Sequence, residues 1–261
     1  TVTVPVDAAG AASALAALRA DPRVEAAQVD HRRSVAAWPN DPLLEYGWPY
    51  ISLTDLPRTW DVTRGAGAVV AVLDTGVSTH EDLAGALLPG IDLVDGDSDP
   101  SDPNGHGTAV AGVAAARSDN GLGSVGAAPS ATILPVRIAD ASGVAQDSTI
   151  AQGMDWAVAH GADVINLSFA GTDAAPVVLA AMRDAVAAGC VVVVAAGNDG
   201  SAVTQYPAAY APAVDGVLAV GATDDGGDVT PFSSWGDWVT VAAPGEQIGA
   251  PLVGGGYEWA S

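Results

Sequence analysis

From about residue 66 onward, short apolar runs alternate with longer stretches of helical character. Unbroken apolar runs bounded by polar residues or glycine are typical of strands that are covered on both faces of a parallel sheet. The alternation predicts a three-layer α/β fold, a mostly parallel sheet flanked by helices. Strands are expected at 68–73, 131–138, 163–167, 190–196, 216–220 and 238–242, and helices at 107–116, 148–160 and 175–188.

The first 37 residues follow a different pattern. Residues 1–6 alternate as in a strand, residues 11–19 are rich in alanine and leucine as in a helix, and residues 24–29 indicate a second strand. Such a β-α-β piece is too small to be stable alone. A polar joint that contains proline follows at 30–42. Two parts are therefore predicted, residues 1–37 and residues 38–261.

Composition and charge exclude several classes of partner. Of the residues, 49% are hydrophobic, the formal net charge is −22, and all nine basic residues are arginines. Because no basic stripe exists, neither nucleic acid nor an anionic membrane surface is an expected partner. No apolar stretch reaches the roughly 18 residues of a membrane span, and residues 1–6 do not resemble a signal peptide. The single cysteine, Cys190, cannot form an internal disulfide and is expected in the core.

Polar residues stand where the predicted strands end. Asp74 follows the first apolar run, Asn166 and Ser168 close the third, and Asn198 follows the fourth, while His106 stands at the start of a predicted helix. Each of these residues alone is common in turns or helix caps. Because ligands bind beyond the carboxyl ends of parallel strands, an acid, a histidine and an amide converging on one edge indicate a catalytic site.

Three segments, in this order, make the pattern specific. Asp74-Thr75-Gly76, Gly105-His106-Gly107-Thr108 and Ala195-Ala196-Gly197-Asn198 resemble the motifs of the subtilisin family of serine proteases. The resemblance implies a serine endopeptidase in which Asp74 orients His106, His106 is the general base, and Asn198 donates to the oxyanion. It also implies that substrate is held by two segments, one containing Ser142 and Gly143 and one formed by Ser168, Phe169, Ala170 and Gly171.

The nucleophile is not assigned within the chain. Residues 257–261 resemble the approach to the family's Ser-Gly-Thr-Ser motif, and Ser261 aligns with its first serine. The catalytic serine is thus expected three residues beyond Ser261, and the 261 residues alone are expected to be inactive. The alternative is a truncated or degenerate relative that binds peptides without cleaving them. An aspartic peptidase is disfavoured, since it needs two Asp-Thr-Gly motifs on an all-β frame and this chain has one.

The resemblance further implies calcium and a propeptide. Asp41, Asp82 and Asn120 resemble calcium ligands, since hard oxygen donors from separate loops suit Ca²⁺, and Asp95, Asp97 and Asp102 are a weaker second candidate site. Residues 1–37 resemble the second half of an inhibitory propeptide that is cleaved near residues 34–38. The expected protein is a secreted monomer whose partners are a polypeptide substrate and its own propeptide.

Overall fold

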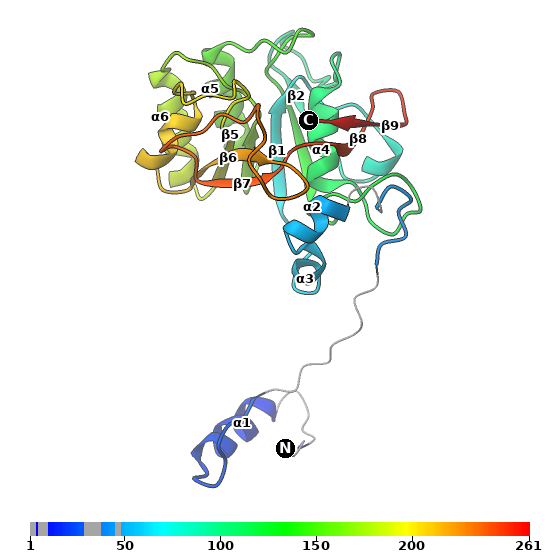
Figure 1. Cartoon of the computed structure of the whole chain (residues 1–261), viewed down its shortest axis with the longest axis vertical. Coiled ribbons are helices and arrows are strands. Elements are labelled where there is room, and N and C mark those ends of the chain that lie inside the picture. The colour runs from blue at the N-terminus through cyan, green and yellow to red at the C-terminus, as the bar shows by residue number, and fades with distance from the viewer. Residues whose placement is uncertain (1–3, 5–9, 29–37, 45–47) are drawn as a thin grey trace. The chain divides into compact units, whose positions relative to one another are not determined.

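The computed structural model describes residue 4 and residues 10–28, 38–44 and 48–261. The chain divides into two compact units, Thr1–Ala37 and Trp38–Ser261, which are described separately. Figure 1 shows the elements of both units along the chain.

In the first unit, α1 spans Ala11–Ala20 and confirms the helix predicted at 11–19. The helix ends at Asp21, whose backbone N–H donates to the carbonyl oxygen of Leu18. The strand predicted at 24–29 is wrong over the described residues 24–28, which form no strand. A strand needs a neighbour to pair with, and none is present in the described part of this unit. The strand predicted at 1–6 falls almost wholly outside the described residues.

The second unit is built on a seven-stranded sheet in the order β2-β3-β1-β4-β5-β6-β7. Every neighbouring pair is parallel, so the predicted sheet type is confirmed. A separate antiparallel hairpin, β8 (Ile248–Pro251) with β9 (Tyr257–Ala260), leads to the last residue. The strands of the large sheet are β1 (Val69–Asp74), β2 (Ile91–Asp92), β3 (Thr132–Arg137), β4 (Val164–Leu167), β5 (Val191–Ala195), β6 (Val217–Thr223) and β7 (Val241–Pro244).

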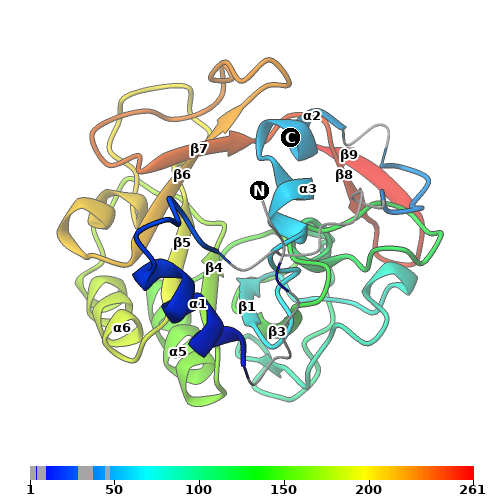
Figure 2. The same ribbon diagram turned by 90° about the horizontal axis from the view of Figure 1, so that it is seen from below.

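Three helices flank this sheet, as predicted: α4 (His106–Ala115), α5 (Asp147–Ala159) and α6 (Pro176–Ala187). Figures 1 and 2 show α5 and α6 next to each other on one side of the sheet, and Figure 1 shows α4 on the other. Helix α4 is rich in glycine and alanine, so its backbone lies close to its neighbours. An added Cβ at Gly112 would lie 2.1 Å from Cδ of Pro251 in β8.

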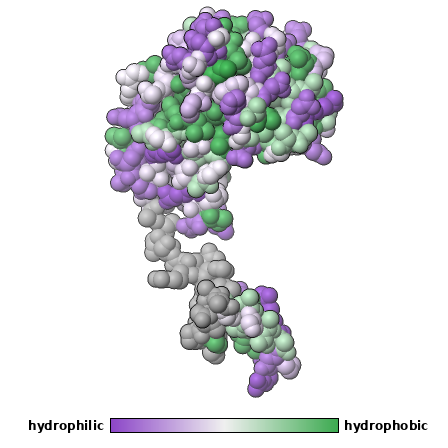
Figure 3. Space-filling view, turned by 180° about the vertical axis from the view of Figure 1, so that it is seen from behind, coloured by the Kyte–Doolittle hydropathy of each residue, from purple (hydrophilic) through white to green (hydrophobic). Residues whose placement is uncertain are grey.

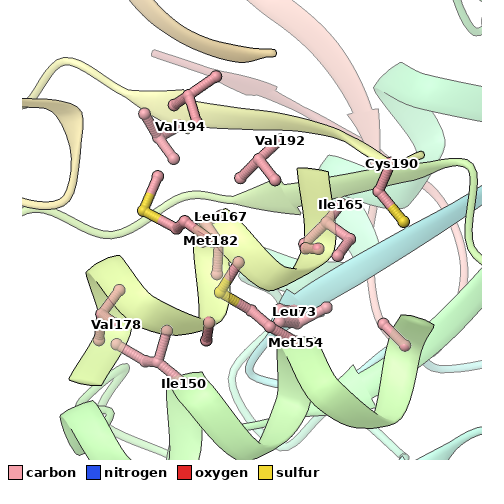
Figure 4. Close-up of a cluster of buried hydrophobic side chains, with 14 of the residues drawn as sticks. Leu73, Ile150, Met154, Ile165, Leu167, Val178, Met182, Cys190, Val192 and Val194 are labelled. Atoms are coloured by element: carbon pink, nitrogen blue, oxygen red, sulfur yellow. The ribbon is translucent and has the colours of Figure 1, made fainter. Parts of the chain in front are cut away.

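The main core lies between the sheet and the layer of α5 and α6. Figure 4 shows side chains of β1, β4 and β5 packed against Met154 of α5 and Met182 of α6. Cys190 belongs to this core, and its Sγ donates to the carbonyl oxygen of Ala162 at 3.0 Å. Burial raises the pKa of the thiol, which therefore stays protonated and unreactive.

The opposite face of the sheet is covered unevenly. In β1 four consecutive residues are buried, because α4 packs on one side and α5 on the other. In β4, β5 and β6, buried residues alternate with half-buried or exposed ones such as Val164, Val193 and Leu218. The prediction that the strands are covered on both faces thus holds for β1 and β3 and not for these three strands.

Two short helices, α2 (Trp48–Leu53) and α3 (Leu56–Trp60), were not predicted from the sequence. They join a small separate core in which Tyr50 and Trp60 pack with Val125 and Ile248. The Tyr50 hydroxyl donates to the carbonyl oxygen of Val125 at 2.6 Å, and Trp60 Nε1 donates to that of Ala127 at 2.9 Å. Tertiary contacts, rather than local helical preference, therefore hold these short segments.

The surface of the second unit mixes hydrophilic and hydrophobic residues, as the view in Figure 3 shows. Among the exposed apolar side chains are Val62, Val203 and Trp235. In the described part of the chain, no helix has the length and apolar character needed to cross a membrane.

Candidate active site

The acid and the histidine predicted from the sequence meet in the structure. Asp74 is the last residue of β1 and its side chain is completely buried, whereas His106 begins α4 and its side chain is 52% exposed. Nδ1 of His106 lies 2.7 Å from Oδ1 of Asp74. A buried carboxylate thus holds one nitrogen of a ring that solvent can still reach.

Two glycines permit this close approach. Gly105 has a φ of 112°, a conformation that L side chains rarely adopt. At Gly107, an added Cβ would lie 2.0 Å from the carbonyl oxygen of Gly76 and 2.9 Å from Cβ of Asp74. A side chain at Gly107 would therefore push the first turn of α4 away from the end of β1.

The electrostatics of the pair favour a charged imidazole. The hydrogen bond to Asp74 raises the pKa of His106; burial opposes this rise, and the negative charges of Asp74 and Asp102 add to it. An adjacent carboxylate stabilises the protonated ring. With Nδ1 engaged by Asp74, the arrangement can take up a proton at Nε2 and stabilise the cation that results.

Asn198 lies at the same edge of the sheet. Strands β1, β4 and β5 are consecutive parallel neighbours, so their carboxyl ends share one edge. Asn198 follows β5 after Gly197, whose φ is 105°, and its side chain is exposed. The fold therefore places the predicted amide donor at the edge that carries Asp74, with one strand between them.

The segment with Ser142 and Gly143 forms a tight turn near the histidine loop. Ala139 and Ala145 form an antiparallel bridge, and the backbone N–H groups of Ser142 and Val144 both donate to Oδ1 of Asp140. Asn104, two residues before His106, donates through Nδ2 to the carbonyl oxygen of Ala141 at 3.1 Å. This turn is thus tied to the loop that carries His106.

The segment Ser168, Phe169, Ala170 and Gly171 directly follows β4 at this edge. Gly171 is paired in both directions with Tyr206, at N–O distances of 2.9 and 2.7 Å. Phe169 packs against the main core, and Asn166 donates through Nδ2 to the hydroxyl of Ser168. The segment is therefore held in place by the main core and by the part of the chain that follows β5.

The subtilase family model matches residues 65–260 of this chain. Over 214 residues the chain is 44% identical to thermitase of Thermoactinomyces vulgaris, an alignment that covers 80% of this chain and 74% of thermitase. It is 43% identical to a thermophilic serine proteinase of Bacillus sp. strain AK1, with 94% of this chain and 61% of that protein aligned. The chain belongs to the subtilase family.

Structure comparison agrees with this assignment. A solved structure described as proteases from Pseudoalteromonas arctica superposes with a TM-score of 0.80 at 32% identity, covering 86% of this chain and 82% of that one. The predicted resemblance and the predicted α/β fold are thus confirmed. The family is that of the subtilisin-like serine endopeptidases, and the chain spans 61% of the Bacillus relative's length.

In this subtilase, Ser261 lies outside the Asp74–His106 pair. Its hydroxyl accepts a hydrogen bond from the backbone N–H of Gln247 at 3.0 Å, and the residue is exposed. Among the described residues, no serine hydroxyl is hydrogen-bonded to the His106 ring. This placement agrees with leaving Ser261 unassigned as a nucleophile.

Asp41, Asp82 and Asn120 come together in the structure. Both carboxylates are buried, and Asp82 Oδ1 accepts from Nδ2 of Asn120 at 2.8 Å. Asp41 accepts from the backbone N–H groups of Asp119 and Asn120. Burial raises the pKa of both carboxyls, and the negative charge of Asp41 raises that of Asp82 further.

The chemistry of this cluster fits a hard cation. Two buried carboxylates lie near each other, and the described residues contribute no basic side chain to pair with either one. An ion of opposite charge would relieve this repulsion, and carboxylate, amide and carbonyl oxygens are the ligands that Ca²⁺ prefers. The described residues contain no group of three or more His, Cys, Asp or Glu side chains that could hold a metal. Any site here would therefore also need amide or carbonyl oxygens.

The weaker second cation site is not supported. Asp95 forms an ion pair with Arg137. Both carboxylate oxygens of Asp102 already accept hydrogen bonds from neighbouring protein groups. Sequence reasoning therefore misjudged Asp102 and also missed Thr75 and Thr108, which bond to it. An aspartate followed by Pro-Asn-Gly is a turn signal that could have indicated a local structural role.

Proposed function

We propose that this chain supplies most of the active site of an endopeptidase in which Asp74, His106 and a serine form the catalytic triad. The observation that carries the proposal is the 2.7 Å contact between His106 Nδ1 and the buried carboxylate of Asp74. The proposal takes the nucleophile to be a serine outside these 261 residues, the third position after Ser261.

In the proposed reaction, His106 Nε2 removes the proton of the serine hydroxyl while its oxygen attacks the carbonyl carbon of the scissile peptide bond. Asn198 donates through its amide to the oxyanion that forms. The imidazolium, stabilised by Asp74, returns the proton to the leaving amine as the C–N bond breaks. Water then repeats the sequence on the acyl-enzyme and releases the free acid.

Substrate is proposed to bind as an extended polypeptide between two segments. The turn at Ser142 and Gly143 offers backbone groups for pairing, and the wall from Ser168 to Gly171 lines the side-chain pocket. Binding through main-chain hydrogen bonds is tolerant of sequence. A broad specificity, with preference for apolar side chains, is therefore expected.

The deciding experiment compares two proteins, the 261-residue chain and the complete product of its gene, on a fluorogenic peptide. The complete protein should hydrolyse it, and His106→Ala should abolish this activity. The 261-residue chain should be about 10⁶-fold slower, since loss of the serine removes the nucleophile. A complete protein that binds peptides with His106 intact but never cleaves them would establish the non-catalytic alternative.

We further propose that residues 1–37 are part of an inhibitory propeptide and that the mature protein is secreted. The support is the family resemblance of this segment and the division of the chain into two units after Ala37. N-terminal sequencing of active enzyme should give a first residue near 34–38. Retention of Thr1 in the active enzyme would overturn this part of the proposal.

The Asp41, Asp82 and Asn120 cluster is proposed to hold calcium. The two buried carboxylates and the amide would be its ligands, and the ion would supply only positive charge there. Because Asp41 and Asp82 belong to separate segments, binding would tie residues 38–44 to the short 3-10 helix Glu81–Leu83, which follows β1, and to the loop at 119–124.

A further inference from the structure

Asp102 is a buried acid for which the proposed reaction has no use. Only 3% of the residue is exposed. Its Oδ1 accepts hydrogen bonds from the Thr75 hydroxyl at 2.8 Å and from the backbone N–H groups of Asn104 and Gly105 at 3.0 and 2.8 Å. Its Oδ2 accepts from the backbone N–H and the hydroxyl of Thr108 at 2.9 and 2.7 Å. One carboxylate thus receives five donors.

These donors come from both sides of the catalytic pair. Thr75 directly follows Asp74 at the end of β1, whereas Gly105 and Thr108 flank His106 at the start of α4. The Thr75 hydroxyl also accepts from the backbone N–H of Gly107 at 3.1 Å. Asp102 therefore connects the residue after the catalytic acid with the turn that carries the catalytic base.

The carboxylate of Asp102 is held in its charged form. Burial alone would raise its pKa, but the hydrogen bonds from Gly105 and Thr108 outweigh burial and leave the pKa of Asp102 below its usual range. Charge-assisted hydrogen bonds are stronger than neutral ones, and an anion beside the N-terminus of α4 is stabilised by the helix dipole. The partners of Asp102 among the described residues are all neutral donors, so its charge is not cancelled by a nearby cation.

That charge reaches His106. The two carboxylates that act on the imidazole are Asp74, through direct contact, and Asp102, through space, and both favour the protonated ring. Asp102 therefore acts on His106 in two ways, through the geometry of its loop and through the field of a fixed negative charge.

We propose that Asp102 is a positioning residue of the catalytic pair, which holds His106 against Asp74 by fastening the end of β1 to the first turn of α4. The proposal rests on the proposed function, because it assigns Asp102 a role in the same Asp74–His106 pair. It does not require the nucleophile, so it can be tested on the 261-residue chain.

The test is an NMR titration of the His106 imidazole in this chain, which has only four histidines. Two signals are followed, the pKa of the ring and the deshielded Nδ1 proton that faces Asp74. Asp102→Asn should lower the pKa of His106, broaden the Nδ1 proton signal, and speed amide exchange at Gly105 and Thr108 about tenfold or more, since hydrogen bonds to a charged acceptor are lost. Asp99→Asn is the matched control, an exposed carboxylate lost from the same loop, and should change none of these.

Two further variants make the outcomes distinct. Thr108→Val keeps the charge of Asp102 but removes one donor, so it should broaden the Nδ1 proton signal even if Asp102→Asn does not fold. An unchanged signal in Thr108→Val, or an unchanged pKa and signal in a folded Asp102→Asn, would overturn the proposal. Asp74→Asn tests the pair itself. If it leaves the His106 pKa unchanged, the proposed function fails, whereas a fall in Asp74→Asn without one in Asp102→Asn removes only the role of Asp102.

Discussion

At the scale of single residues, the site combines the buried carboxylate of Asp74 with the solvent-exposed imidazole of His106. Asp74 has no exposed surface, and its Oδ2 lacks a hydrogen-bond partner among the described residues. Such a carboxylate is costly to bury unless a positive charge forms beside it. The charge of Asp74 is therefore best compensated when the His106 ring is protonated.

In the proposed reaction, the raised pKa of His106 sets the pH dependence of activity. The base must be neutral to act, so kcat/KM of the complete protein should rise with pH through a midpoint above about 6.5, the ordinary value for histidine. A flat profile from pH 4 to 9 would contradict the role of His106.

Asp74→Asn should lower kcat of the complete protein about 10⁴-fold, because the ring loses the partner that orients it.

The same shift has a consequence for stability. Because the folded pKa of His106 lies above the unfolded value, the Asp74 contact stabilises the fold most at pH values below the unfolded pKa. That contribution is lost as the pH rises through the folded pKa. Activity and this part of stability should thus change in opposite directions across the same pH window.

Asn198→Ala tests the oxyanion donor. In the complete protein, kcat should fall about 10²–10³-fold while KM stays nearly constant, since the hydrogen bond forms only in the transition state. The melting temperature should hardly change, because the side chain is exposed. An increased KM with an unchanged kcat would instead assign Asn198 to substrate binding.

At the scale of elements, the sequence predicted the strands and helices that have a continuous apolar pattern. The runs at 68–73 and 131–138 became β1 and β3 within one or two residues, and α4, α5 and α6 began and ended close to their predicted positions. Strand β7 begins at Val241 rather than residue 238, since pairing with β6 starts there. Helices α2 and α3 were missed because their few residues owe their shape to distant contacts.

The candidate site was likewise predicted only in part. Its motifs identified Asp74 and His106. Their contact could be expected because Asp74 ends a strand and His106 begins a helix. The turn signal after Asp102 could indicate a local structural role, but not the hydrogen bond from Thr75, because that contact exists only in the folded structure. No pattern in the sequence indicates that one carboxylate accepts five hydrogen bonds.

The contact of α4 with β8 gives a prediction at this scale. Gly112→Ala would place a methyl group against the ring of Pro251, and overpacking of this kind should lower the free energy of unfolding by about 1–3 kcal/mol. The matched control is Gly171→Ala, where an added Cβ meets nothing within 4 Å. Urea unfolding of both variants measures the difference, and equal stabilities would contradict the close approach.

At the scale of the whole molecule, calcium bound at the proposed site would link segments that the sheet does not hold together. The pKa values of Asp41 and Asp82 are raised, so their ionisation without a cation destabilises the fold increasingly as the pH rises through those values. A bound cation removes this cost.

Excess EDTA should therefore lower the melting temperature, and added calcium should restore it. The difference should be largest near neutral pH and shrink as the pH falls, because protonated carboxyls bind calcium weakly. Asp82→Asn should lose most of the calcium effect, whereas Asp99→Asn, an exposed carboxylate elsewhere, should keep it. A melting temperature that is indifferent to chelator at every pH would remove the calcium proposal.

The pairing of β1 with two strands that come later in the chain affects how the sheet forms during synthesis. Val69 in β1 pairs with Thr132 in β3 and Val70 pairs with Val164 in β4, so neither neighbour of β1 exists when β1 is made. At about 5–20 residues per second, a ribosome needs several seconds to supply them. During that interval an apolar strand lacks its pairing partners and is prone to aggregate. Rapid dilution from denaturant, which exposes many such strands at once, should therefore recover less native protein as the concentration is raised.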